Sequence, residues 1–250
     1  MDLGIEGRTA LVMAASRGIG KGVAGALARE GARVAISSRS EEALQAAAEE
    51  IAGEVRTFPA DTGDLDRLRR LPGEVAEALG PVEILVANTG GPPGGGALDN
   101  SLEDWEAAFR SLVLAPRVLI EEVLPGMRER GWGRIVNVSS SSIREPIPGL
   151  ALSNANRMAA LGLLETLADE VAGDGITVNT VATGMFATDR LADRQGSLEQ
   201  AEAAARERIP ARRLGQPEDY GDLVAFLCSE PAAYLTGAVI PLDGGLLRSV

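Results

Sequence analysis

The segment Thr9–Gly20 reads TALVMAASRGIG, and it decides the fold. Its first half, Thr9–Ala14, is an apolar run typical of a buried strand, and a helical pattern extends from Ile19 to Glu30. Glycines between them let the backbone approach a diphosphate closely, and the helix start offers free N–H groups and the positive end of its dipole. We therefore expect a dinucleotide-binding turn made by Ala14, Ser16, Arg17, Gly18, Ile19 and Gly20.

The same alternation of short aliphatic runs and longer helical stretches continues to the end of the chain. Further strands are expected at Arg33–Ser37, Glu54–Phe58, Glu83–Ala87, Arg134–Val138, Ile176–Val181 and Ala238–Leu242. The intervening helices are expected at Glu41–Ala52, from the cap Asp64 to Leu79, from Ser101 to Arg130 with a kink or break at Pro116, and at Leu150–Gly173, Thr188–Arg208 and Pro217–Ser229. Such crossovers predict a doubly wound α/β fold with a parallel sheet, in a single domain over residues 1–250.

Composition excludes several kinds of chemistry. The chain has 24 Lys and Arg residues against 36 Asp and Glu, a net charge of −12 that argues against a nucleic-acid partner. No histidine is present and Cys228 is the only cysteine, so no His-based triad, disulfide within the chain or Cys-rich metal site is expected. No apolar window is long enough to span a membrane, and a cytoplasmic protein is the default expectation.

The end of the second expected strand indicates which dinucleotide is bound. Proteins that bind NAD usually place an acidic residue there, whereas this chain has Ser38 and Arg39. A guanidinium pairs well with a 2′-phosphate, and Arg17 in the glycine turn could assist. NADP(H) is therefore favoured over NAD(H).

Several separate motifs, in order, resemble those of the short-chain dehydrogenase/reductases, and most closely the β-ketoacyl-acyl carrier protein reductase branch. They are Ser16–Gly20, Asp61 with Thr62, Ala87–Gly90, Arg134–Ser140, Thr183–Gly184 with Thr188, Leu214–Glu218 and Leu242–Gly245. The resemblance implies a Rossmann-type sheet of seven strands in the order 3-2-1-4-5-6-7, a lid near residues 186–210 and a homotetramer. It also implies cofactor contacts from Asp61, Thr62, Asn88, Gly90, Gly184 and Thr188, and a catalytic Ser140.

The chain departs from the family pattern at the catalytic group. The family tyrosine, thirteen positions after the serine, is replaced by Ser153, and the lysine four positions further on is replaced by Arg157. With tyrosine only at 220 and 234 and lysine only at 21, no Tyr-x-x-x-Lys pair exists in this sequence. The family's helix asparagine falls on Leu112, and Ala14 stands where the family turn has glycine.

These losses leave three interpretations open. In the first, which we favour, the protein is a slow NADP(H)-dependent reductase of a small carbonyl or acyl substrate. Ser140, Ser153 and Arg157 would polarise the carbonyl, Arg157 would also bind the ribose hydroxyls, and water would supply the proton, since losing a positioned acid typically costs about 10²–10⁴-fold in rate. In the second, the protein binds nucleotide without catalysis and acts as a sensor or regulator. In the third, Ser139–Ser142 and Asn154–Asn156 bind a different class of substrate, and another residue is the acid.

Overall fold

Seven parallel strands form the central sheet, in the predicted order β3-β2-β1-β4-β5-β6-β7. The computed structural model describes residues 1–249, and Val250, the last residue of the expected domain, lies outside the described residues. The strands are β1 (Thr9–Met13), β2 (Arg33–Ser37), β3 (Val55–Thr57), β4 (Val82–Ala87), β5 (Gly133–Val138), β6 (Ile176–Thr183) and β7 (Val239–Leu242).

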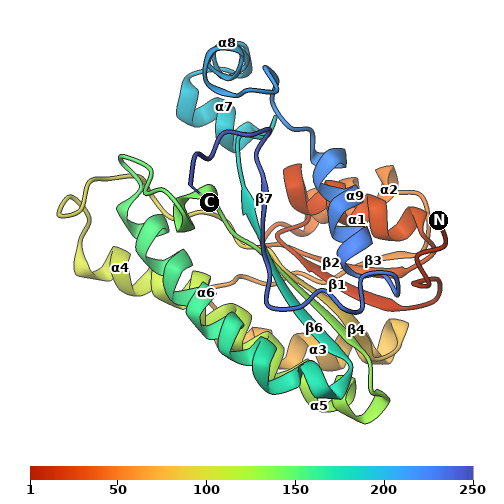
Figure 1. The fold of residues 1–250 in the computed structure, drawn as a ribbon. Coiled ribbons are helices and arrows are strands. Elements are labelled where there is room, and N and C mark those ends of the chain that lie inside the picture. Colours follow the sequence, from red (N-terminus) through yellow and green to blue (C-terminus); the bar gives the residue numbers. More distant parts are fainter. Residues whose placement is uncertain (250) are drawn as a thin grey trace.

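Helices cover both faces of this sheet, and a pair of short helices stands beyond its carboxyl edge (Figure 1). One face carries α1 (Gly18–Arg29), α2 (Glu41–Glu50) and α9 (Pro217–Leu227). The other carries α3 (Leu65–Leu79), α5 (Ala115–Arg130) and α6 (Ala151–Val171). The helix α4 (Leu102–Phe109) precedes α5, and the short pair is α7 (Asp189–Gln195) and α8 (Leu198–Arg208).

Alternating side chains of the buried strands build two separate cores. In β1, Ala10 and Val12 contribute to the core under α1 and α9, whereas Leu11 and Met13 contribute to the core under α3, α5 and α6. This period of two, with apolar residues on both sides, is what a parallel sheet covered on both faces requires. A third, smaller core lies in the α7–α8 region and consists of Leu191, Ala201, Ala205, Ile209 and Leu214.

Two helical segments differ from the sequence expectation in their internal breaks. The segment expected as one helix over Thr188–Arg208 is two helices, because Gly196 takes a left-handed φ of 91° and the Ser197 hydroxyl then caps α8. Ser101 caps α4 as expected. The disturbance near Pro116 is a π-helical turn over Arg110–Leu114, after which α5 continues with Pro116 in its first turn, where the missing N–H is tolerated.

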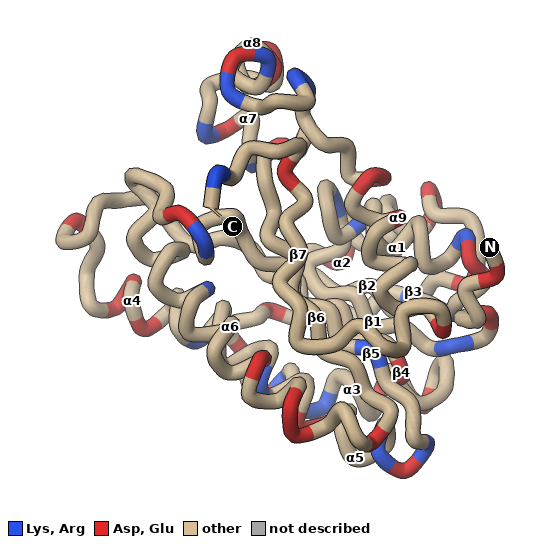
Figure 2. The backbone as a smooth tube through the Cα atoms, viewed as in Figure 1, with Lys and Arg blue, Asp and Glu red and all other residues tan. Residues whose placement is uncertain are grey.

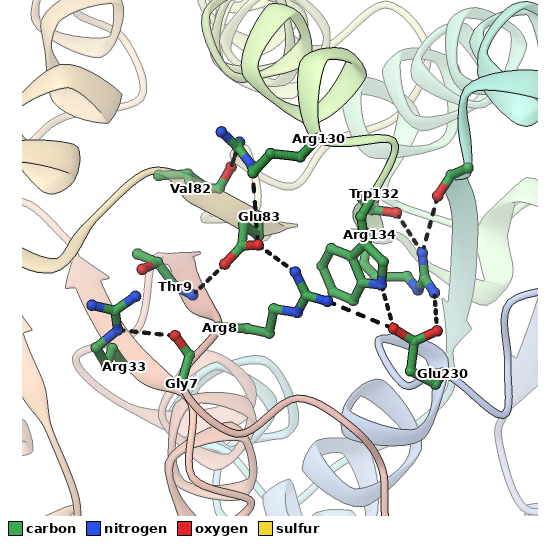
Figure 3. Close-up of polar contacts among 12 residues, drawn as sticks. Gly7, Arg8, Thr9, Arg33, Val82, Glu83, Arg130, Trp132, Arg134 and Glu230 are labelled. Carbon is green, nitrogen blue, oxygen red and sulfur yellow. Dashed lines mark hydrogen bonds and ion pairs between the residues drawn. The ribbon is translucent and has the colours of Figure 1, made fainter.

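A cluster of polar contacts connects the amino ends of β1, β4 and β5 at one edge of the sheet (Figure 3). The Trp132 ring lies between two guanidinium groups, with Arg8 Cζ 4.0 Å and Arg134 Cζ 4.3 Å from its centroid. Glu230 accepts a hydrogen bond of 2.7 Å from the Trp132 indole, and Arg8 pairs with Glu83. Because Arg134 is 1% exposed and donates to three backbone carbonyls, this cluster is structural.

Charged residues of both signs line α7 and α8, while the central strands carry few (Figure 2). No helix within residues 1–249 combines the length and the apolar character that crossing a membrane requires.

Candidate active site

The glycine turn between β1 and α1 has the geometry of a phosphate cradle. Gly18 has a φ of 55°, and a Cβ on Gly20 would lie 2.3 Å from the Ala14 carbonyl oxygen, so the close approach requires glycine. Ala14 itself lies just after β1 with a left-handed φ of 48°, a conformation that costs a residue with a side chain about 1–2 kcal/mol. The strand therefore ends at Met13, one residue earlier than the apolar run suggested.

Polar groups around this turn leave the start of α1 open. The Asn88 side chain donates a 3.2 Å hydrogen bond to the Ala14 carbonyl and so joins the end of β4 to the turn. No side chain caps α1, whose preceding residue is Arg17. Its first N–H groups are consequently available to an anion, while Ser16 and Ile19 are partly accessible beside them.

A second group of the expected cofactor residues gathers at the ends of β2 and β3. Arg39 is exposed directly after Ser38, and the Ala60 N–H donates to the Ser38 carbonyl, which brings Asp61 and Thr62 alongside. The Asp61 carboxylate accepts from the Gly63 N–H at 2.8 Å. In the part of the chain that the structure describes, the buried hydroxyls of Ser37 and Ser38 have no hydrogen-bond partner.

The segment after β6 returns to the glycine turn. Gly184 donates its N–H to Leu242, and a Cβ there would lie 2.5 Å from Asp243 Cα. Thr188 caps α7 through its hydroxyl, and its methyl group lies 3.2 Å from the position of a Cβ on Gly18. The structure thus brings Thr188 to the glycine turn, and Gly90 is exposed in the loop after β4; their contacts with the cofactor stay predictions.

Arg190 connects α7 to that loop, a contact that the sequence did not predict. Its guanidinium donates to the carbonyls of Gly91 at 3.0 Å and Pro92 at 3.1 Å, and desolvation lowers its pKa. The many charges of this segment suggested that most of its side chains face solvent, and Arg190 is exposed while it makes these contacts. The only available signal was its position two residues after Thr188, which could not specify backbone acceptors in a distant loop.

The three expected catalytic residues follow β5 and begin α6. Arg157 donates from Nε to the Ser153 hydroxyl at 3.1 Å and from Nη1 to the carbonyl of Val138, the last residue of β5, at 2.8 Å. Ser140 lies two residues after Val138, and its hydroxyl accepts from the Ser142 N–H at 3.1 Å. The arrangement offers hydroxyl groups and one guanidinium, and no carboxylate or imidazole.

Burial shifts the pKa values of Arg157 and of the nearby Tyr220. Desolvation lowers the pKa of Arg157 to about 10, against the raising effect of the nearby Tyr220 phenol, so the guanidinium is charged at neutral pH. Tyr220 is itself fully buried, hydrogen-bonded to the Thr183 hydroxyl at 3.0 Å, and packed edge-on against Phe186. Burial raises its pKa well above the usual value, and it therefore stays neutral at physiological pH. Tyr234 is fully exposed.

The remaining positions of the site have structural partners. Leu112 is buried in the π-helical turn, where it packs with Val113, Ala160 and Leu163, and it leaves no polar group at this position. Asn154 exchanges hydrogen bonds with the backbone of Ile147, and Asn156 donates to the Leu152 carbonyl within α6. Both amides are thus occupied by internal contacts.

Comparison with known proteins identifies the family to which this chain belongs. The model of the family described as enoyl-(acyl carrier protein) reductase matches residues 13–247. Dehydrogenase/reductase SDR family member 4 from Homo sapiens is 35% identical over 245 residues, covering 96% of this chain and 88% of the relative. The 3-oxoacyl-[acyl-carrier-protein] reductase FabG of Aquifex aeolicus is 33% identical over 250 residues, covering 98% and 100%.

Solved structures agree with these matches. L-sorbose reductase from Gluconobacter frateurii, complexed with NADPH and L-sorbose, superposes with a TM-score of 0.94 at 29% identity, over 100% of both chains. A 3-oxoacyl (acyl-carrier-protein) reductase from Agrobacterium tumefaciens with NADP bound gives 0.91 at 31% identity, over 98% of this chain and 96% of that one. The chain belongs to the short-chain dehydrogenase/reductase family. Within that family of oxidoreductases it resembles the 3-oxoacyl-acyl carrier protein reductases.

Proposed function

We propose that this protein is an NADP(H)-dependent reductase of a small carbonyl or acyl compound, working without the family's tyrosine and lysine. The observation that carries the proposal is the contact of Arg157 with Ser153 and with the end of β5, close in sequence to Ser140. A charged guanidinium and two hydroxyls can polarise a carbonyl and stabilise the alkoxide that its reduction creates.

The residues around the glycine turn fit such a cofactor. Gly18 and Gly20 form a cradle that side chains would fill, and the uncapped start of α1 suits a diphosphate. The unpartnered hydroxyls of Ser37 and Ser38, beside Arg39, suit a phosphorylated ribose. Asp61 and Thr62 would flank the adenine, with Asn88, Gly90, Gly184 and Thr188 lining the remainder.

The reaction would depend on electrostatic stabilisation. NADPH supplies a hydride when bound. Ser140 and Ser153 donate hydrogen bonds to the carbonyl oxygen, and Arg157 stabilises the negative charge that develops on it. Neither hydroxyl is acidic enough to be an efficient proton donor, so the proton comes from water. The rate is therefore low for this family, by about 10²–10⁴-fold if only the positioned acid is lost.

The family resemblance supports further parts of the proposal. Residues 1–250 form one domain in which the segment near 186–210 closes as a lid, and four copies assemble in the cytoplasm through the two long helices and the C-terminal strand. The names of the relatives suggest acyl or sugar-like carbonyl substrates. Sedimentation that gives only monomer would refute the tetramer.

A catalytically inactive sensor is the second candidate, favoured by the state of Tyr220: this phenol lies near Arg157, but it is fully buried and burial raises its pKa well above the usual value. Binding of NADPH, followed by its fluorescence, and its oxidation with a panel of carbonyl compounds, followed by absorbance, separate the two. Turnover above the protein-free background supports the reductase. Tight binding with no turnover supports the sensor.

Arg39 provides the test of cofactor preference. Arg39→Ala should weaken NADPH binding about tenfold or more and leave NADH binding nearly unchanged, because only NADPH carries the 2′-phosphate. A wild-type protein that binds NADH more tightly than NADPH would contradict the assignment.

A further inference from the structure

The positive charge of Arg157 is not balanced by the described part of the protein. Both of its hydrogen-bond acceptors are neutral, namely the Ser153 hydroxyl and the Val138 carbonyl. Within residues 1–249, Nη2 makes no hydrogen bond and no carboxylate forms an ion pair with the guanidinium. Arg157 is only partly exposed, and because desolvating an unpaired charge is costly, a counter-ion from a bound molecule is expected.

The surroundings add positive charge and unused donors. Arg190 is the other ion that acts on Arg157, and it raises the local positive potential. It is exposed and donates to backbone carbonyls, and the nearby Asp193 partly offsets its charge. On the segment after β5, the buried hydroxyls of Ser139 and Ser142 have no hydrogen-bond partner among residues 1–249. The end of β5 is therefore rich in donors and lacks an anion.

The phosphates of the cofactor have other partners. The diphosphate is expected at the start of α1, and the 2′-phosphate at Ser38 and Arg39. Both places lie at the ends of β1 and β2, whereas Arg157 is bonded to the end of β5, which is separated from β1 by β4. The substrate is therefore the remaining bound molecule that can supply a negative charge to the Arg157 guanidinium.

We propose that the substrate bears a carboxylate bonded to its reacting carbonyl carbon or one carbon further away, and that Arg157 binds this carboxylate through its free Nη2 group. The substrate class is thus the oxo acids in reduction and the hydroxy acids in oxidation. This inference rests on the proposed reductase function. It assigns to Arg157 a role in substrate selection that the lysine of the family pattern, with no planar fork of donors, would serve poorly.

The test compares acids with their neutral esters on the protein saturated with NADP⁺. Calorimetric titrations with pyruvate against methyl pyruvate, and with acetoacetate against methyl acetoacetate, measure the preference directly. We expect one of the acids to bind at least about tenfold more tightly than its ester, since a charge-assisted contact is lost in the ester. Arg157→Gln should reduce the ratio to about one. Arg144→Gln, which removes an exposed arginine on the loop after Ser142, should leave it unchanged.

The outcomes separate this inference from the function on which it rests. Esters that bind as tightly as acids, or acids that bind Arg157→Gln as tightly as wild type, overturn it. If NADP⁺ binds while neither the acids nor the esters do, the carboxylate subsite is refuted and the nucleotide site stands. If NADP⁺ itself fails to bind, the proposed function fails and takes this inference with it.

Discussion

Arg157 Nε lies 3.1 Å from the Ser153 hydroxyl, one helical turn earlier in α6. The spacing is that of the family's tyrosine and lysine, so the scaffold still holds two polar side chains where the acid and its partner would stand. The double variant Ser153→Tyr/Arg157→Lys should therefore raise kcat/KM with NADPH and a reducible carbonyl by about 10²–10⁴-fold. Steady-state kinetics test this, with the two single variants as controls. No gain in a folded double variant would show that the pocket no longer accepts such substrates.

Ala14→Gly should stabilise the protein. The left-handed φ of 48° is unfavourable for alanine and natural for glycine, and this gain exceeds the entropy that glycine adds to the unfolded chain. We expect the free energy of unfolding to rise by roughly 0.5–1 kcal/mol, measured by urea denaturation. The adjacent Ala15→Gly is the control. Because Ala15 is fully buried, this change should lower the free energy of unfolding by about 1 kcal/mol. Equal effects of the two changes would contradict the argument.

Gly20→Ala should weaken nucleotide binding and stability together. The added methyl would meet the Ala14 carbonyl oxygen at 2.3 Å and force the turn apart. NADPH affinity should fall by at least about tenfold, measured by fluorescence titration, while the unfolding midpoint also falls. Gly25→Ala in the same helix has nothing within 4 Å of the new methyl and should be neutral or stabilising by up to about 1 kcal/mol. Unchanged NADPH binding in Gly20→Ala would refute the cradle.

Arg134→Met should destabilise the fold without changing NADPH affinity. Its removal takes a hydrogen-bond donor away from the buried carbonyls of Gly133 and Ser229 and from the more exposed carbonyl of Gly175, at the amino edge of the sheet. A loss of about 2–4 kcal/mol is expected in denaturant unfolding. Arg33→Gln removes a single exposed hydrogen bond and should cost no more than about 0.5 kcal/mol. A change in NADPH affinity in Arg134→Met would show coupling between the two edges.

Cys228 should resist alkylation in the native protein. It is fully buried, and burial raises the pKa of its thiol to about 12, so at pH 8 it is protonated as well as inaccessible. Iodoacetamide at pH 8 should label it only as fast as the protein unfolds, and labelling should become rapid above the denaturation midpoint. Labelling of folded protein within minutes would indicate local opening around α9.

The central fold could be predicted because it depends on local apolar patterning. The run Thr9–Met13 is hydrophobic on both sides of the strand, a pattern that fits only a sheet covered on two faces. The assignment of Ser140, Ser153 and Arg157 to the catalytic group came from their spacing and the family resemblance, and it stays a prediction. Three features could not be predicted from the sequence. They are the left-handed conformation of Ala14, the bonds of Arg190 to Gly91 and Pro92, and the contact of Tyr220 with Thr183. These features depend on contacts between residues far apart in the sequence, and no periodic pattern of residues indicates such contacts.

The small core shared by α7 and α8 has a consequence for how this chain can change. Its five buried residues pack on one another and belong to neither of the two cores that hold the sheet. The segment is joined to the body by the backbone hydrogen bonds of Met185 and Ala187 with Gly215, and by the contacts of Thr188 and Arg190 described above. Replacing everything between Ala187 and Gly215 would therefore leave the packing on both faces of the sheet intact. The region can therefore vary in sequence without disturbing the two cores of the sheet, while changing the contacts that Thr188 and Arg190 make with the loops after β1 and β4.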